Sequence, residues 1–333
     1  MKQGDMMARE RLTVIQERGS HLESQHPIVA AVVDTQGRSL LDLNQDLVTT
    51  FRSSAKPFQL WGCLDLLSEE QRRDVTEQQL ALGASSHSGE VDHVAGVRAI
   101  LEHFALNEEE FLCGTHWPVH AQSAYAVAAS GQKATAIHNN CSGKHAFMMA
   151  ARKQSPPSNS NDYRTLEHPI QQAIYKRVNQ ASDHGIVDTV IDGCGVPCFV
   201  MSMRAMALTW ARLAGAMAQN SGNLGRIGWA MHRHPHLMSG TGRLDYALVR
   251  AGRQPLVAKV GAEGVQCLAI PHLGIGVAIK VQSGASDPRA AASLAILEKV
   301  APGLMDADVM KKWLELRNWE GLLVGRRYAQ WND

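Results

Sequence analysis

The sequence predicts an α+β fold in which strands from both ends of the chain form one antiparallel sheet, with helices on one face and a mostly helical middle. Short apolar runs rich in β-branched residues lie near both ends, and the region between them has helical periodicity. No GxGxxG or GxxxxGK[ST] segment occurs, so a doubly wound nucleotide-binding fold is not indicated. We expect residues 1–333 to form a single catalytic unit, with its terminal α+β portion at about 20–55 and 250–333 and its helical middle at about 56–250.

The N-terminal portion begins with a predicted β-hairpin. Pro27–Asp34 (PIVAAVVD) is a short apolar run, a turn follows at Gln36–Arg38, and Ser39–Leu43 forms the return strand. Apolar residues at helical spacing then predict a helix from about 55 to 67, where Pro57 fits only the first turn. The same spacing predicts further helices at about 91–103, 144–152, 168–180 and 203–218.

The C-terminal portion returns to strands. Pro255–Val260, Val265–Ile270 and Ile275–Val281 are β-rich runs joined by short turns, which is typical of an antiparallel meander. A helix is predicted at about 288–300. Segments 154–161 and 238–243 are rich in small polar residues, proline or glycine, so we expect loops there.

Charge and composition exclude several classes of protein. Lys+Arg total 33 and Asp+Glu total 32, a net charge of +1, which gives no reason to expect a nucleic-acid partner. The six cysteines are too sparse for a disulfide scaffold. The N-terminal residues form no apolar signal segment, and no apolar run could span a bilayer. We therefore expect a cytoplasmic protein with reduced thiols that binds neither membranes nor nucleic acid.

The segment Arg52–Pro57 (RSSAKP) contains a Ser-x-x-Lys pattern. At the start of a helix, Ser53 and Lys56 would lie one turn apart on the same face. A serine hydroxyl needs a base to become a nucleophile, and lysine serves as that base only when burial, a nearby cation or a helix N-terminus lowers its pKa. Alone, the pattern is equally typical of a helix cap followed by a solvated lysine.

Two further segments could complete a serine-dependent site. Ser85–Glu90 (SSHSGE) reads either as an active-site loop or as a capped turn before the following helix. Lys259 lies in a C-terminal strand followed by a small-residue turn, either facing solvent or acting as a Lys-x-Gly box. Ser-x-x-Lys followed downstream by Lys-x-Gly is the order found in penicillin-recognising serine acyl-transfer enzymes, although the middle Ser-Asp-Asn box is missing.

Three cysteine segments do not have standard zinc spacing. They are Cys113–His116 (CGTH), Asn139–His145 (NNCSGKH) and Asp192–Pro197 (DGCGVP). Zinc sites usually combine cysteine and histidine at CxxC or HxxxH spacing. By spacing alone, these cysteines are interpreted as buried thiols.

Taken together, seven segments resemble the Rhizobium-type, thermolabile L-asparaginases of the asparaginase II family. They occur in family order between about residues 25 and 285: RSSAKP (52–57), SSHSGE (85–90), CGTH (113–116), NNCSGKH (139–145), DGCGVP (192–197), GTGRLD (240–245) and KVGAEG (259–264). The resemblance implies a fold similar to serine β-lactamases and glutaminases. It also implies hydrolysis of L-asparagine to L-aspartate and ammonia by a homodimer.

The resemblance also assigns roles to individual residues. It implies two Ser–Lys pairs, Ser53 with Lys56 and Ser86 with Lys259. It implies a zinc ion bound by two cysteines and a lysine, and a group of residues that hold the substrate. The zinc ligands would be Cys141, Lys144 and Cys194, and the substrate-holding residues Arg52, His145 and Asp192.

The expected mechanism is a serine acyl-enzyme. Ser53 attacks the side-chain amide while neutral Lys56 takes its proton, and backbone N–H groups hold the oxyanion. Ser86 and Lys259 relay a proton to the leaving ammonia. For the substrate head group, Arg52 would bind the α-carboxylate, and Asp192 or Glu263 the α-amino group. Zinc is expected to orient groups or regulate the site, not to act as a Lewis acid, and the acyl-enzyme chemistry does not require it.

Two departures from the family pattern leave the choice of substrate open. Gly195 stands where the resemblance leads us to expect asparagine, and the final strand, 275–284, lacks the expected acidic turn. One alternative is another serine amidohydrolase, either a glutaminase or a β-lactamase-like peptidase. The others are a catalytically degenerate binding homologue and a protein in which zinc is only structural.

Overall fold

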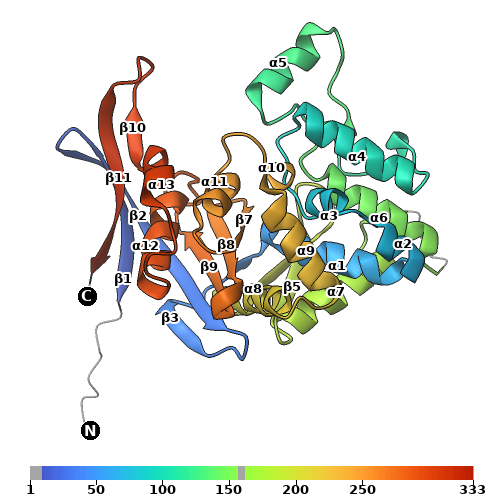
Figure 1. Ribbon diagram of the computed structural model, residues 1–333, viewed down its shortest axis with the longest axis horizontal. Coiled ribbons are helices and arrows are strands. Elements are labelled where there is room, and N and C mark those ends of the chain that lie inside the picture. Colours follow the sequence, from blue (N-terminus) through green and yellow to red (C-terminus); the bar gives the residue numbers. More distant parts are fainter. Residues whose placement is uncertain (1–9, 157–161, 333) are drawn as a thin grey trace.

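An antiparallel sheet formed by both ends of the chain lies at one side of the molecule (Figure 1). The computed structural model describes residues 10–156 and 162–332. The strand order is β10-β11-β1-β2-β9-β8-β7, with β3 paired to β2. The strands are β1 (Arg11–Arg18), β2 (His21–Asp34), β3 (Ser39–Leu43), β7 (Val257–Gly261), β8 (Val265–Ile270), β9 (Ile275–Val281), β10 (Glu315–Arg317) and β11 (Leu323–Asn332). The predicted hairpin and meander are confirmed as β2–β3 and β7–β8–β9.

The middle of the chain forms the helical lobe at the other side (Figure 1). Its α-helices are α1 (Lys56–Leu66), α2 (Glu69–Asp74), α3 (Glu77–Gly83), α4 (Val91–His103), α5 (Ala121–Ala129), α6 (Ser142–Gln154), α7 (Pro169–Ala181), α8 (Met203–Ala218), α9 (Gly222–Arg233) and α10 (Pro235–Met238). The next helix, α11 (Leu244–Ala251), packs against β7 and α13 beside the large sheet. Two further helices, α12 (Arg289–Val300) and α13 (Ala307–Leu314), follow β9. The 3-10 turns are η1 (Arg52–Ala55), η2 (Glu108–Glu110), η3 (Ala136–His138) and η4 (Pro271–Leu273).

The six helices predicted from periodicity are all present, but the middle is not purely helical. A three-stranded antiparallel sheet, β4-β6-β5, consists of β4 (Val48–Thr50), β6 (Pro197–Ser202) and β5 (Ile186–Ile191). Local periodicity did not reveal this sheet, because β4 pairs with a strand about 150 residues further along the chain. Of the two predicted loops, residues 157–161 lie outside the described residues, and 239–243 connects α10 to α11.

Helices pack on one face of the large sheet, as expected, and the helical lobe covers its other face. On β2, Val29, Ala31 and Val33 pack in a core shared with α8 and the helical lobe. The alternate residues of the same strand, Ile28, Ala30 and Val32, pack on the opposite face of the sheet. There they form a second core with α11, α12 and α13. Because successive side chains point to opposite faces, a continuous apolar run such as PIVAAVV fits a strand that is buried on both sides.

All six cysteines are free and buried. Within residues 10–156 and 162–332, no helix has the length and apolar character needed to cross a membrane.

Candidate active site

Ser53 lies in a strained turn between β4 and α1. The preceding residue, Arg52, has φ of +50°, a conformation that non-glycine residues seldom adopt and that costs about 1–3 kcal/mol. Its Nε donates to Asp192 Oδ1 at 2.9 Å, an ion pair that helps to fix this turn. The Ser53 side chain is half-buried and makes no hydrogen bond within the described part of the chain. Its hydroxyl is therefore free to meet a ligand.

Ser86 lies between two buried lysines. Lys56 Nζ is 2.9 Å from Ser86 Oγ, and Lys259 Nζ is 2.8 Å from the same oxygen. Lys56 comes from the first turn of α1, Ser86 from the loop after α3, and Lys259 from β7. The structure thus brings together all four residues that the resemblance pairs. Both lysines, Lys56 and Lys259, are hydrogen-bonded to Ser86. The structure shows no Ser53–Lys56 hydrogen bond.

The hydrogen bonds around the two lysines favour different protonation states. Lys56 Nζ also donates to the backbone oxygens of Ser85 (2.6 Å) and Asn140 (3.2 Å), so three acceptors match the three protons of an ammonium group. Lys259 has only the Val260 oxygen, at 3.0 Å, besides Ser86. Burial lowers the pKa of Lys259 to about 7, and Lys56 and Arg243 add to that effect. A neutral Lys259 could accept the proton of Ser86.

Asp245 is a site residue that sequence reasoning missed. It is buried at the start of α11, and its Oδ2 lies 3.9 Å from Lys259 Nζ. The carboxylate also accepts from Val260 N and Gln266 Nε2, both at 2.9 Å. Its charge raises the pKa of Lys259 against the stronger effect of burial. Asp245 lies in the GTGRLD segment. Its contacts with residues of β7 and β8 could not be identified without the tertiary structure.

A cavity of about 360 Å³ opens beside these groups. Ser53 and Ser86 both line it, so both hydroxyls can face one bound molecule. The rest of the wall comes from the loop before α6, the loop before α11 and the start of that helix, the end of β7 and the turn after it, the start of α12, and α13. The lining residues include Asn140, Ser239, Arg243, Asp245, Ala262, Asp287, Arg289 and Trp313.

A second buried cluster combines thiols with an amine. Lys144 Nζ lies 3.0 Å from Cys194 Sγ, and Cys141, Lys144 and Cys194 are all less than a tenth exposed. A hydrogen bond from Cys194 lowers the pKa of Cys141 well below its usual range. Burial lowers the pKa of Lys144, but the neighbouring Cys194 and Cys141 raise it by more. The cluster therefore favours a thiolate beside a cation or a metal ion.

His145 adjoins this thiol cluster. Its Nδ1 is 2.9 Å from Tyr163 Oη, whereas its buried Nε2 has no hydrogen-bond partner within the described residues. Burial lowers its pKa to about 4, so the ring is neutral. A neutral imidazole nitrogen without a partner is a potential metal or substrate ligand.

Close packing places the thiol cluster next to Ser86. A Cβ atom on Gly143 would lie 2.3 Å from the Leu82 carbonyl oxygen, so only glycine lets α6 approach the end of α3 this closely. His87 Nε2 lies 2.8 Å from Ser142 Oγ and ties the two segments together. Burial holds the pKa of His87 well below its usual range, which makes this histidine a neutral structural link.

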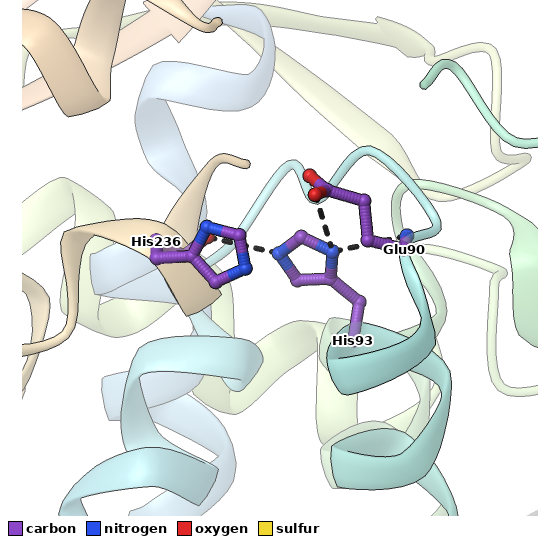
Figure 2. A group of neighbouring side chains, drawn as sticks. All are labelled: Glu90, His93 and His236. Atoms are coloured by element: carbon purple, nitrogen blue, oxygen red, sulfur yellow. Dashed lines mark hydrogen bonds and ion pairs between the residues drawn. The ribbon is translucent and has the colours of Figure 1, made fainter. Parts of the chain in front are cut away.

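Glu90, His93 and His236 form a compact group between α4 and α10, shown in Figure 2. His93 Nδ1 accepts from Glu90 N at 3.1 Å, and its Nε2 lies 2.9 Å from the His236 carbonyl oxygen. Both ring nitrogens are therefore engaged, which leaves His93 no lone pair for a metal ion. Glu90 accepts from Ser88 Oγ and from Thr241, and these bonds hold the 239–243 loop against the site.

Glu263 is the predicted site residue that lies apart. It is exposed at the tip of the β7–β8 turn with φ of +58°, and it does not line the catalytic cavity. Asp192 is bonded to Arg52 instead of facing that cavity. Gly195, the departure from the family pattern, has φ of +85°. Since asparagine is among the residues that tolerate positive φ, the turn explains why glycine can replace it.

Comparisons with solved structures find similarity at low identity. Mglu in its native form is 17% identical, with a TM-score of 0.40 over 84% of this chain and 62% of its own, so the chain spans less than two thirds of its length. A β-lactamase from Mycobacterium bovis is 12% identical, with a TM-score of 0.44 over 82% of this chain and 94% of its own. Simvastatin synthase from Aspergillus terreus is 10% identical, with a TM-score of 0.39 over 77% and 86%.

A comparison with curated proteins finds no matching sequence. The family comparison is decisive, because L-asparaginase II matches residues 14–327. That range includes both sheets apart from the outer ends of β1 and β11, together with the two lysines around Ser86, the thiol cluster and the cavity. The chain belongs to the L-asparaginase II family.

Proposed function

We propose that this protein hydrolyses the side-chain amide of L-asparagine to L-aspartate and ammonia through a serine acyl-enzyme. Family membership supports an amidohydrolase. The observation that carries the proposal is Ser86 Oγ held between Lys56 and Lys259 in the wall of a cavity that Ser53 also lines. A free hydroxyl, a relay hydroxyl and a lysine with a lowered pKa are the groups that acyl transfer needs.

In the proposed reaction, Ser53 attacks the amide carbon, because its hydroxyl has no competing hydrogen bond. Ser86 passes protons, and neutral Lys259 is the base that drives the transfer. Lys56, with three acceptors, acts as an ammonium that stabilises negative charge near Ser86. This assignment differs from the sequence-based mechanism, in which Lys56 takes the proton of Ser53, because a saturated ammonium has no lone pair to offer.

The proton on Lys259 then protonates the departing ammonia. Water hydrolyses the aspartyl ester by the same route in reverse, and backbone N–H groups near Ser53 hold the oxyanion at both steps. Catalytic hydrogen bonds are often long without substrate and shorten in the complex. We expect Ser53 to come into contact with Ser86 or Lys56 once a substrate fills the cavity.

For the substrate head group we retain the Arg52–Asp192 pair as the proposed binding element. A zwitterionic amino acid could exchange this ion pair for two new ones, its carboxylate on Arg52 and its ammonium on Asp192. The His145 side chain contacts Cys194, which follows Asp192 by two residues in the sequence. Glu263 would have to move from the exposed turn tip to take part.

We also propose that Cys141, Lys144 and Cys194 hold a zinc ion. Two buried thiols, one of them with a lowered pKa, and an amine form a soft donor set of the kind that zinc accepts. His145 Nε2 is a buried nitrogen without a partner beside them. These residues fit the ion. Zinc bound there would add positive charge beside Asp192 and orient the head-group element, and Lys144 would bind it in the neutral form.

The experiment is ammonia release from L-asparagine, with L-glutamine measured alongside. The wild type should release ammonia from asparagine faster than from glutamine, and Ser53→Ala should lose at least about 1,000-fold in turnover. Its stability should change little, since the hydroxyl makes no hydrogen bond in the described structure. Release from neither amide by folded protein, with and without zinc, would refute the proposal. Full activity in Ser53→Ala would refute the nucleophile. Homodimer formation and a cytoplasmic location stay predictions.

A further inference from the structure

The catalytic cavity has a second wall whose chemistry the proposed mechanism does not use. α11, α12 and α13 lie on one side of the large sheet (Figure 1) and pack against each other. Their ends contribute Arg243, Arg289 and Trp313 to the cavity that Ser53 and Ser86 line. Arg289 and Trp313 lie outside the sequence motifs, and the GTGRLD segment gave Arg243 no role, so the surroundings of these residues indicate what they bind.

Arg289 is a buried cation without an ion partner. It is 9% exposed, and its Nε donates to the Ser286 carbonyl oxygen at 2.8 Å. Its Nη1 is buried without a hydrogen bond, and the guanidinium has no ion pair within residues 10–156 and 162–332. A guanidinium carries five N–H donors, and buried donors nearly always have acceptors. Arg289 therefore lacks the acceptor that its burial requires.

Other donors in the same wall also lack acceptors. Trp313 Nε1 and Ser239 Oγ are buried atoms with no hydrogen bond among the described residues. Arg243 is half-buried, and its side chain makes neither a hydrogen bond nor an ion pair in the part of the chain that the structure describes. Several unsatisfied donors around one cavity indicate a ligand that supplies acceptor oxygens.

The net positive charge around the cavity favours an anionic ligand. Two acids face this region, Asp245 and Asp287; Asp245 already accepts two hydrogen bonds, and Asp287 pairs with Arg327 at 2.8 Å. The cations outnumber these acids even when Lys259 is neutral, because Lys56, Arg243 and Arg289 are also near. An excess of positive charge with low-dielectric walls attracts anions, and a guanidinium fork matches a planar carboxylate.

We propose that Arg289, with Arg243 and Trp313 Nε1, forms a carboxylate-binding subsite in the catalytic cavity. This inference rests on the proposed function, because it assumes that the molecule bound there has its amide at Ser53. The subsite is separate from Arg52, whose guanidinium is paired with Asp192. If Arg52 binds the α-carboxylate as proposed above, the subsite binds the carboxylate at the far end of a longer acidic amide; if it does not, the subsite binds the α-carboxylate in place of Arg52.

Binding to the Ser53→Ala variant, measured by calorimetry, tests the subsite without turnover. The probes are L-asparagine, its α-carboxamide analogue, β-L-aspartylglycine and succinate. Adding Arg289→Gln should weaken binding of a carboxylate-bearing probe at least tenfold, and adding Arg243→Gln or Trp313→Phe should weaken it severalfold. Arg250→Gln is the matched control, because Arg250 is exposed on α11 and does not line the cavity; it should leave every affinity unchanged.

The probes identify the source of the carboxylate. Weaker binding of L-asparagine, but not of its carboxamide analogue, assigns the subsite to the α-carboxylate. Unchanged L-asparagine binding with weaker β-L-aspartylglycine binding assigns it to a longer acidic amide. Arg243→Gln and Trp313→Phe keep the test decisive if Arg289→Gln does not fold.

Unchanged affinity of all four probes in folded Arg243→Gln and Trp313→Phe variants would overturn the subsite. Succinate separates this inference from the proposed reaction, because its binding needs no amide. If the wild type releases no ammonia from asparagine but binds succinate in an Arg243-dependent manner, only the proposed reaction fails.

Discussion

Lys259 and Lys144 are both fully buried, yet their surroundings act on them in opposite directions. Lys259 contacts a serine hydroxyl and a backbone oxygen, with Asp245 at 3.9 Å, and burial lowers its pKa to about 7. Lys144 contacts Cys194 Sγ, and the neighbouring thiols raise its pKa despite burial. Burial alone therefore does not decide whether a lysine is a base or a cation; the groups placed beside it do.

This difference divides the site into two halves with separate tasks. The half around Lys259 can move protons, because burial lowers the pKa of its amine to about 7 and both protonation states are then accessible near neutral pH. The half around Lys144 can hold charge, because a thiolate and a cation, or a metal ion, stabilise each other there. The five predictions below test this division, beginning with the largest expected effect.

Replacing Lys259 with methionine should remove the base. Turnover of L-asparagine should fall by about 10²–10⁴, the usual range for general acid–base groups, while the buried methylene stem is retained. Steady-state ammonia release measures this. Lys280→Met is the control, a lysine of strand β9 in the same sheet that lies outside the cavity. Normal turnover in Lys259→Met would remove this lysine from the mechanism.

Replacing Cys194 with alanine should weaken zinc binding by at least about 100-fold, since a thiolate ligand is lost. Zinc titration of the apoprotein measures the affinity. For the wild type, zinc at 100 times its Kd should add about 2.7 kcal/mol to the free energy of unfolding, and a chelator should remove that gain. Cys63→Ala, a buried thiol in α1, should keep its zinc affinity. Equal zinc affinity in Cys194→Ala and wild type would exclude the proposed metal site.

The pH profile should show the titration of Lys259. Its kcat/KM should rise as pH passes about 7, because the neutral amine forms there. The charged groups that act on Lys259 are Asp245, Lys56, Arg243 and Cys141. Since Asp245 raises the pKa of Lys259, Asp245→Asn should move the midpoint to lower pH, whereas Asp287→Asn should not. A midpoint that stays fixed or moves upward would show that Asp245 does not act on Lys259.

The same titration affects stability with a defined sign. In the unfolded chain a lysine has a pKa of about 10.4, so between about pH 7 and 10 the unfolded state binds a proton that the folded state does not. The contribution of Lys259 to stability should therefore increase as pH rises through that window. Denaturant unfolding of wild type and Lys259→Met at pH 7 and 9 measures it, and the pH-dependent gain should be smaller in the variant.

The smallest effect should come from Ser85, the direct neighbour of Ser86. Its buried hydroxyl has no hydrogen-bond partner in the described structure, and only its backbone oxygen contacts Lys56. Ser85→Ala should change turnover by less than about twofold, because removing an unpaired hydroxyl costs little. Ser86→Ala, one residue away, should lose about 100-fold. Similar losses in both variants would mean that the loop, and not the Ser86 hydroxyl, matters.

Much of the fold could be predicted because its signals are local. The apolar run at Pro27–Asp34 is the buried part of β2, and the predicted helix at 91–103 is α4 (Val91–His103). β1 and β11 gave no clear signal, since they are rich in polar residues and are held by pairing across the whole chain. The helix α5 has no buried residue, so no apolar face marked it.

The residues of the site likewise divide into those with a local sequence signal and those without one. Ser53, Lys56, Ser86, Lys259 and the thiol cluster could be named because their motifs are short and occur in family order. Asp245, Arg289 and Trp313 could not be assigned, because each acts only through residues that are distant in the sequence. The pairing of Ser53 with Lys56 stays a prediction, because the loop after α3 brings Ser86 Oγ within 2.9 Å of Lys56 Nζ and the structure shows no hydrogen bond between Ser53 and Lys56.

The sequence by itself determined the chemical groups, their order and the helices and strands that carry them. The tertiary structure alone decided which lysine is neutral, which hydroxyl is free and which donors face the cavity without an acceptor. The physical reason is that desolvation and Coulomb energy depend on distances between packed side chains. Lys259 and Ser86 are 173 residues apart in the sequence and 2.8 Å apart in space, and no local pattern contains that distance.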